Sequence, residues 1–270
     1  MISFPHEQEL MEDIDRIESN MRISPSAGLL PTDIRETVKK LIESTKQRTR
    51  VSDIYLDMIR NLNCAPYLTR LNSSPPFSDQ PISNPLISCS DTDYQIAVTP
   101  ENNEAFCSFL CLIVDGFFSN LIGASDSFAK IVNILYNCIN SMDNIYLHKV
   151  RDRLVSRIPR GRLTVTIKTF HPRNPSGSIF NVAKDIRNEL THDILDVMDF
   201  PPLHAMYGRL PESALRFHFK ERFFQSLVSS RVDRELTRFC TAAHEELAGF
   251  IDGAYGMMLN KLNTTGQIPV

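Results

Sequence analysis

Arg187, Asn188 and His192 lie within six consecutive residues and combine a permanent cation, an amide and an imidazole. Arginine presents a planar pair of donors that fits a phosphate or a carboxylate, and histidine can take up or release a proton near neutral pH. This combination is typical of a site that binds an anionic group and moves a proton beside it. It is equally compatible with side chains that only satisfy carbonyl groups at a helix end.

The spacing of the arginine and the histidine does not decide between these interpretations. A second pair, Arg238 and His244, has almost the same spacing, and chance alone would place about as many such pairs in a chain of this composition. A five-residue step rotates by about 140° on an α-helix, so Arg187 and His192 would not share one helical face. They would converge at a helix end or across a two-fold axis. The polar residue Asn188 distinguishes the first pair, because Arg238 is followed by Phe239.

Most of the chain shows the three- and four-residue apolar spacing of amphipathic helices. The pattern predicts helices over residues 4–22, 32–62, 99–122, 123–142, 143–158, 178–192 and 230–262. Thr32 and Thr99-Pro100-Glu101 are typical of helix starts. Two stretches rich in alternating or β-branched residues, 162–170 and 214–223, predict strands that pair as a small antiparallel ribbon.

Five prolines in residues 64–98 exclude a long helix there and predict a surface excursion or a linker. We therefore expect two parts. Residues 1–98 would form N-terminal helices plus a Pro-rich insertion packed on the bundle, and residues 99–270 would form a helical domain. A chain of 270 residues is long enough for one large core or two small domains.

The composition excludes several classes of protein. The formal net charge of −3 argues against uniform attraction to nucleic acid, so any anion-binding surface must be local. The apolar stretch 105–122 contains Asp115 and Asn120 and predicts a buried core helix rather than a membrane span. The six cysteines form no CxxC pair, and the acidic N-terminus does not resemble a signal peptide. We expect a cytoplasmic protein with reduced thiols, no metal, no cofactor and no membrane contact.

The stretch IRNELTH, residues 186–192, resembles the signature of the HEPN superfamily (higher eukaryotes and prokaryotes nucleotide-binding domains). That signature is an arginine, a polar residue directly after it, and a histidine after four to six further positions. Residues 114–133, VDGFFSNLIGASDSFAKIVN, resemble an apolar bundle helix of the same superfamily that carries an aspartate. Asp115 and Asp126 are eleven residues apart, which places them on one face of a continuous helix. The resemblance covers roughly residues 100–262 and leaves residues 1–98 unexplained.

The resemblance implies an all-α antiparallel bundle that dimerises so that two motifs face each other, and it implies one of two functions. The first is a metal-independent endoribonuclease of the toxin or phage-defence type. His192 would then be the general base on the ribose 2′-hydroxyl, Arg187 would stabilise the phosphorane charge, and Asn188 would orient the phosphate or the imidazole. Asp115, Asp126 and Glu189 would be supporting residues. The second function is that of a catalytically inactive HEPN-fold module that binds RNA, a nucleotide or a protein partner.

A basic segment precedes the motif and suggests a path for RNA. Residues 149–173 hold eight basic residues and one acid, Asp152, so the local balance is +7. The candidate RNA-binding residues are Arg151, Arg153, Arg157, Arg160, Arg162 and Lys168. The alternative is that an isolated helix and a ribbon simply expose their charges to water. The partners that we expect are RNA, a second copy of the chain, and an antitoxin or another protein inhibitor.

One position departs from a subset of the superfamily. Some HEPN toxins carry a tyrosine two residues after the histidine, which a partner nucleotidyltransferase modifies. Here that position is Ile194, so control by this modification is not expected.

Overall fold

The computed structural model of the chain is mostly helical. It describes residues 31–61, 69–72, 94–97, 104–136, 138–139, 144–173, 178–190, 194–199, 217–225, 227 and 232–265. The predicted helix over residues 4–22 and the motif histidine, His192, lie outside these ranges.

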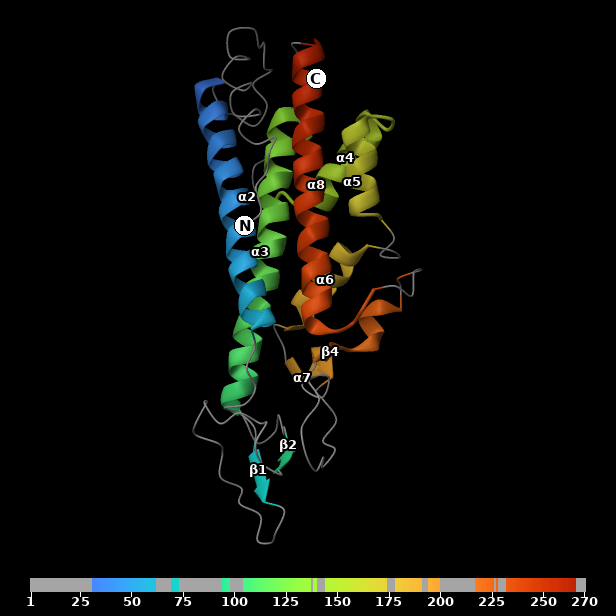
Figure 1. Cartoon of the computed structure of the whole chain (residues 1–270). Helices are drawn as coiled ribbons and strands as arrows, with labels where there is room; N and C mark the ends of the chain where they lie inside the picture. Colours follow the sequence, from blue (N-terminus) through green and yellow to red (C-terminus); the bar gives the residue numbers. More distant parts are fainter. Residues whose placement is uncertain are drawn as a thin grey trace.

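Three long helices lie side by side and form the body of the fold (Figure 1). They are α2 (Pro31–Arg60), α3 (Glu104–Tyr136) and α8 (Leu236–Thr265). Helix α2 runs along α3 and also contacts α8. Helix α3 continues through Gly123, where the sequence predicted either the start of a second helix or a kink. Its buried side chains keep three- and four-residue steps across this glycine, because Phe117, Leu121, Ala124 and Phe128 are all fully buried.

The core is rich in aromatic side chains contributed by segments far apart in the sequence. The Phe118 ring lies 5.9 Å from Phe219 and 6.3 Å from Phe239, and Phe219 packs edge-on against Phe239 at 5.3 Å. Edge-to-face pairs at such distances are favourable beyond the area that they bury. They join the start of α8 and the segment before it to the middle of α3.

Shorter helices cover the side of α3 and α8 that faces away from α2 (Figure 1). They are α4 (Leu147–Arg157), α5 (Arg162–Phe170), α6 (Ile179–Leu190) and α7 (Ile194–Val197), followed later by the 3-10 helix η5 (Glu221–Phe224). Helix α6 lies against both α3 and α8, and α4 and α5 pack against each other.

The strand predicted over residues 162–170 is wrong, because these residues form helix α5. Leu163, Ile167 and Phe170 are buried at helical steps, whereas Val165, which a strand would place on the same face as Leu163 and Ile167, is 50% exposed. A ribbon of only two strands, with no larger sheet around it, buries little apolar surface. Packing of the helical face against α8 and α4 therefore overrides the local preference of these residues for a strand.

The second predicted strand exists only in part and has a different partner. Strand β4 (His218–Phe219) pairs antiparallel with β3 (Met198–Asp199), with Met198 opposite Phe219. A second small ribbon joins β1 (Thr69–Asn72) to β2 (Tyr94–Ala97) inside the Pro-rich window, where no strand was predicted.

Helix α8 begins at Leu236, six residues later than the sequence suggested. The Glu235 carboxylate accepts the backbone N–H groups of Thr237 at 3.0 Å and Arg238 at 2.9 Å. These bonds satisfy donors that the first turn of a helix leaves free, so they fix its start.

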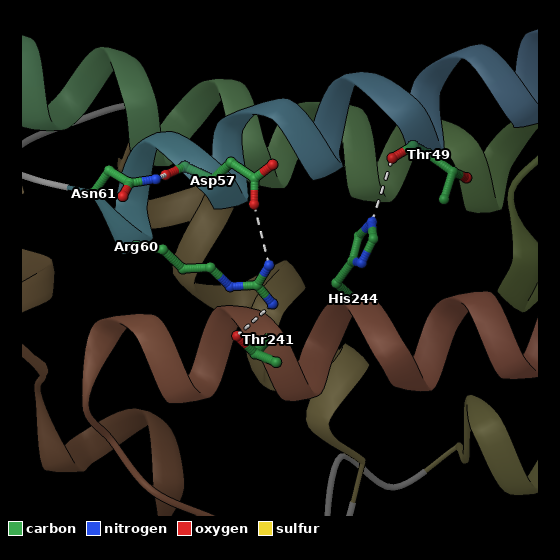
Figure 2. Close-up of polar contacts among 6 residues, drawn as sticks. All are labelled: Thr49, Asp57, Arg60, Asn61, Thr241 and His244. Atoms are coloured by element: carbon green, nitrogen blue, oxygen red, sulfur yellow. Dashed lines mark hydrogen bonds and ion pairs between the residues drawn. The ribbon is translucent and has the colours of Figure 1, made fainter. Parts of the chain in front are cut away.

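Polar contacts tie α2 to α8, as Figure 2 shows. The Nε2 atom of the buried His244 lies 3.3 Å from the carbonyl oxygen of Thr49. Arg60 donates to Thr241 at 3.4 Å and to Asp57 at 3.1 Å. His244 therefore holds two helices together. Arg238 has a different role, because its exposed guanidinium pairs with Asp233 at 2.6 Å. The second arginine–histidine pair of the sequence is not a site.

The apolar stretch 105–122 lies within α3, and its side chains from Leu110 onward supply much of the core. Within the described ranges, no helix combines the length and the apolar character that crossing a bilayer would require.

Close contact between α2 and α3 depends on Gly116, and we predict that Gly116→Ala destabilises the fold. A Cβ at this position would lie 2.6 and 2.8 Å from Cε1 and Cε2 of the Tyr55 ring, which would have to move. Overpacking of this kind costs about 1–3 kcal/mol. Chemical denaturation of the variant and the wild type would measure the difference.

Gly253→Ala is the matched control, because it places the same methyl group on another long helix. Nothing lies within 4 Å of a Cβ built there. Replacing an exposed helical glycine by alanine should stabilise the protein by about 0.5–1 kcal/mol. Equal effects of the two substitutions would show that the ring of Tyr55 does not set the spacing of α2 and α3.

Candidate functional site

A cavity of about 230 Å³ lies among α3, α6, the start of α4 and the end of α5. Three residues singled out from the sequence meet there: Asp126 from α3, and Arg187 and Asn188 from α6. The remaining lining residues are Ile122, Ser125, Tyr146, Leu147, His148, His171, Phe180 and Lys184. The cavity therefore brings together one residue of the apolar segment 114–133 and two residues of the arginine motif.

Helix α6 presents the motif because one of its faces is buried. Phe180, Ala183, Ile186 and Leu190 follow three- and four-residue steps and are buried. Lys184 and Arg187 are only half-buried and are three residues apart, so they lie on one face. This face turns toward Asp126 of α3.

The first turn of α6 is anchored by two side chains from different parts of the chain. The Ser178 hydroxyl donates to the Phe170 carbonyl at 2.7 Å and accepts the Asn181 N–H at 3.3 Å. The Glu246 carboxylate of α8 accepts the Phe180 N–H at 3.1 Å. These bonds satisfy free donors at the helix start and fix α6 against α8 and the end of α5.

Asp126 carries the one carboxyl among the described residues that line the cavity, and its pKa is shifted. Burial raises the pKa of this carboxyl to about 6. Nearby cations act in the opposite direction and are, in decreasing order of effect, Lys184, Lys130, Arg48 and Arg187. The loss of hydration outweighs the attraction of these charges, so the Asp126 carboxyl exchanges its proton close to neutral pH.

Two histidines that the sequence did not single out line the cavity. His171 is buried, and burial lowers its pKa to about 4, with the charges of Arg151 and Lys184 acting in the same direction. Burial also lowers the pKa of His148. The two rings pack edge-on at 6.4 Å. His171 is therefore neutral near pH 7, and it adds a polar but uncharged surface to the cavity.

The Nε atom of Arg187 is buried without a hydrogen-bond partner among the described residues. The side chains of His171 and Asn181 interact with each other, and this hydrogen bond opposes part of the fall in the pKa of His171. Buried polar groups are normally paired with protein, water or a ligand. Arg187 lines the cavity, so the cavity wall offers one hydrogen-bond donor that the described residues do not use.

The other residues predicted for the site lie elsewhere. Asp115 is three helical turns before Asp126, about 16 Å along the helix axis, and accepts the Ser119 hydroxyl at 3.3 Å. Glu189 is exposed and pairs with Arg222 at 2.8 Å. His192 lies outside the described residues.

The basic segment divides into one structural residue and several exposed ones. Arg151 is buried and donates to the His171 carbonyl at 2.8 Å and to Asp152 at 2.9 Å. It holds the end of α5 against α4. The side chains of Arg153, Arg157, Arg160, Arg162 and Lys168 are exposed.

Sequence reasoning missed Lys184, Tyr146, His148 and His171. Lys184 could have been found, because it precedes Arg187 by three residues and shares its helical face. The other three come from the segments around α4 and α5, and no pattern in the sequence places these segments beside α6.

Comparisons with protein-family models, with curated proteins and with solved structures found no match to the chain. In the described part of the chain, no three His, Cys, Asp or Glu side chains are grouped so that they could hold a metal ion. Cys138 and Cys240 are buried thiols, and Cys111 is half-buried. The site is therefore interpreted from its own chemistry.

Arg48 of α2 lies against α3 one turn before Asp126, and we predict that Arg48→Gln raises the pKa of Asp126 above about 6. Gly123 makes room for the guanidinium, because a Cβ there would lie 2.9 Å from Arg48 Cζ. The Arg48 charge favours the carboxylate, so its loss favours the protonated acid. Carbon-13 NMR titration of the Asp126 carboxyl would measure the shift.

Arg50→Gln is the control, because Arg50 is exposed on the same helix and is not among the cations that act on Asp126. It should leave the titration of Asp126 unchanged. The same shift in both variants would mean that net charge, rather than the position of Arg48, governs the carboxyl.

Proposed function

We propose that the protein is a metal-independent endoribonuclease of the HEPN type. One observation carries the proposal: Arg187 and Asn188 of the motif line the same cavity as Asp126 of the second stretch that resembles the superfamily. These residues are about sixty positions apart in the sequence, so their meeting is a property of the fold. The all-α bundle is compatible with the superfamily.

The cations of α6 are suited to hold the scissile phosphate. Lys184 and Arg187 lie on one helical face, and the Nε atom of Arg187 is buried with no hydrogen-bond partner in the part of the chain that the structure describes. A guanidinium binds two phosphate oxygens at once, and a charge-assisted hydrogen bond is stronger in a partly buried site than in water. We assign Arg187 to the negative charge that develops on the phosphorane, Lys184 to a second oxygen, and Asn188 to orientation of the phosphate.

Asp126 is suited to act as a general acid. An aspartate with an ordinary pKa is almost fully ionised at neutral pH, whereas a carboxyl with a pKa of about 6 keeps a useful fraction of its protons. A bound phosphate adds a negative charge beside the carboxyl and raises its pKa further. The protonated form then avoids repulsion between Asp126 and the substrate.

His192 is the proposed general base, two residues after the last residue of α6. It removes the proton of the ribose 2′-hydroxyl as the 2′-oxygen forms a bond to phosphorus. The bond from phosphorus to the 5′-oxygen breaks, and Asp126 gives its proton to that oxygen. The products are a 2′,3′-cyclic phosphate and a 5′-hydroxyl, so atoms and protons balance without a metal.

The wider features of the proposal follow the superfamily. Two chains would bring two motifs to one cleft, and the exposed arginines of α4 and of the turn after it, Arg153, Arg157 and Arg160, would guide the phosphate backbone toward it. A toxin or phage-defence role, with an antitoxin or another protein inhibitor, is part of the same proposal. The alternative, a catalytically inactive HEPN-fold module, would use the same cavity only for binding.

We expect the purified protein to cleave RNA in the presence of EDTA and to leave 2′,3′-cyclic phosphate ends. Substitutions Arg187→Ala, Asp126→Asn and His192→Ala should each lower the rate by about 10²–10⁴-fold, because each removes charge stabilisation or proton transfer. Gel analysis of end-labelled RNA with and without phosphatase treatment would measure rates and identify the ends.

Arg238→Gln is the matched control, because Arg238 belongs to the arginine–histidine pair that is not a site and its guanidinium is exposed. It should retain the wild-type rate. Full activity of His192→Ala would overturn the base assignment. RNA binding by the wild type without cleavage of any RNA tested would favour the inactive binding module.

The pH dependence tests the acid assignment. We predict that kcat/KM falls as the pH rises above about 6, because the free enzyme then loses the proton that Asp126 must donate. The slower Asp126→Asn variant should lack this fall, since its amide does not titrate. A fall of the same shape in both proteins would assign the acid to another group.

A further inference from the structure

The cavity has an uncharged floor and a charged wall. Its most buried residues are Ser125, Leu147, Phe180 and His171, of which His171 is 7% exposed and the others are 2% or less. The charged residues Asp126, Lys184 and Arg187 are half-buried and lie farther out. A phosphate has charged partners on the wall but little to bind on the floor. The ligand that fits both zones has an anionic part and an uncharged part.

The floor suits a planar, mildly polar group. The Phe180 and His171 rings meet edge-on at 5.7 Å. Burial keeps His171 uncharged near pH 7, and its side chain interacts with that of Asn181. Apolar ring surface combined with a neutral nitrogen and the Ser125 hydroxyl matches the mixture of flat faces and polar edges found in a nucleobase.

The rings of Tyr146 and His148 form an aromatic surface at the rim of the cavity, which we call the shelf. The Tyr146 and His148 rings are almost parallel, with 6° between their planes and 5.8 Å between their centres. Both line the cavity, and Tyr146 is 40% exposed. The Lys149 ammonium lies 5.2 Å from the Tyr146 ring centre and adds positive charge next to the shelf. Exposed aromatic rings beside cations are the features that bind unpaired bases.

We propose that the cavity is a nucleotide subsite that receives one unpaired nucleobase. The base stacks on Tyr146 at the rim and reaches toward the floor at Phe180 and His171, and its phosphate stays on the wall at Lys184 and Arg187. The identity of the ligand as an RNA nucleotide rests on the proposed function. A cavity of about 230 Å³ is smaller than most small-molecule sites, so it has room for one nucleobase but not for a base pair. A base must leave a helical stack before it can enter.

Binding of mononucleotides tests the subsite without any need for cleavage. Adenosine and uridine 5′-monophosphates would be compared with ribose 5-phosphate, which has the same sugar and phosphate but no base. We expect the better nucleotide to bind at least tenfold more tightly by calorimetry. In NMR spectra, the ring signals of His171 should move with the nucleotide and stay in place with ribose 5-phosphate.

Tyr146 variants test the shelf. Tyr146→Ala should weaken nucleotide binding by about 5–100-fold, the range for loss of one stacking ring, and leave ribose 5-phosphate binding unchanged. Tyr146→Phe keeps the ring and should bind as the wild type does. Equal affinities for nucleotides and ribose 5-phosphate, or equal losses in the two variants, would overturn the subsite.

The outcomes separate this inference from the ribonuclease proposal. Preferential binding of nucleotides without cleavage of RNA would keep the subsite and reject the enzyme. Cleavage of RNA without any preference for nucleotides over ribose 5-phosphate would keep the enzyme and reject the subsite.

Discussion

The fold depends on covering helix α3, which is apolar on most of its circumference. Its buried side chains, among them Phe117, Phe118, Leu121 and Phe128, point in several directions around the helix axis. No single neighbour can cover such a helix, so α2, α8 and the shorter helices α4 and α6 each take part. Removal of this surface from water is the main favourable contribution to folding, at about 1.5–3 kcal/mol for each large side chain. The positions of the other helices follow from this requirement.

Burial of the Asp126 carboxylate in such a helix costs free energy, and the surrounding cations reduce this cost. An isolated buried carboxylate would be strongly disfavoured, and a shifted pKa is the usual response. Here cations from three helices face the carboxyl: Lys184 and Arg187 from α6, Arg48 from α2 and Lys130 from α3 itself. They reduce the cost but do not cancel it. A group of this kind, held between protonated and ionised forms near neutral pH, is common where proton transfer is needed.

Helix α2 contributes to the charge balance around Asp126, although it lies outside the part of the chain that resembles the HEPN superfamily. It lies in the N-terminal part that the resemblance leaves unexplained, yet it packs along α3 and is tied to α8 through Thr49 and His244. A hydroxyl pair, Ser44 with Ser127 at 3.2 Å, fixes it beside the residue that follows Asp126. Arg48 therefore acts on the Asp126 carboxyl although it does not line the cavity. A shift of α2 along α3 would change the electrostatics of the cavity without touching its lining.

The sequence by itself determined the helical class, helix α2 to within a few residues and the burial of the apolar stretch in α3, and it singled out the Arg187 segment as a candidate site. These features depend on local periodicity and on residue types, which can be read from a single sequence. The sequence divided α3 at Gly123 and began α8 six residues too early. Only the tertiary structure decided that residues 162–170 are a helix, because packing against α4 and α8 outweighs their preference for a strand. It also decided that Asp126 rather than Asp115 faces Arg187, and that Tyr146, His148 and His171 complete the cavity. Such groupings join segments that are distant in sequence, and no periodic pattern specifies which faces will meet.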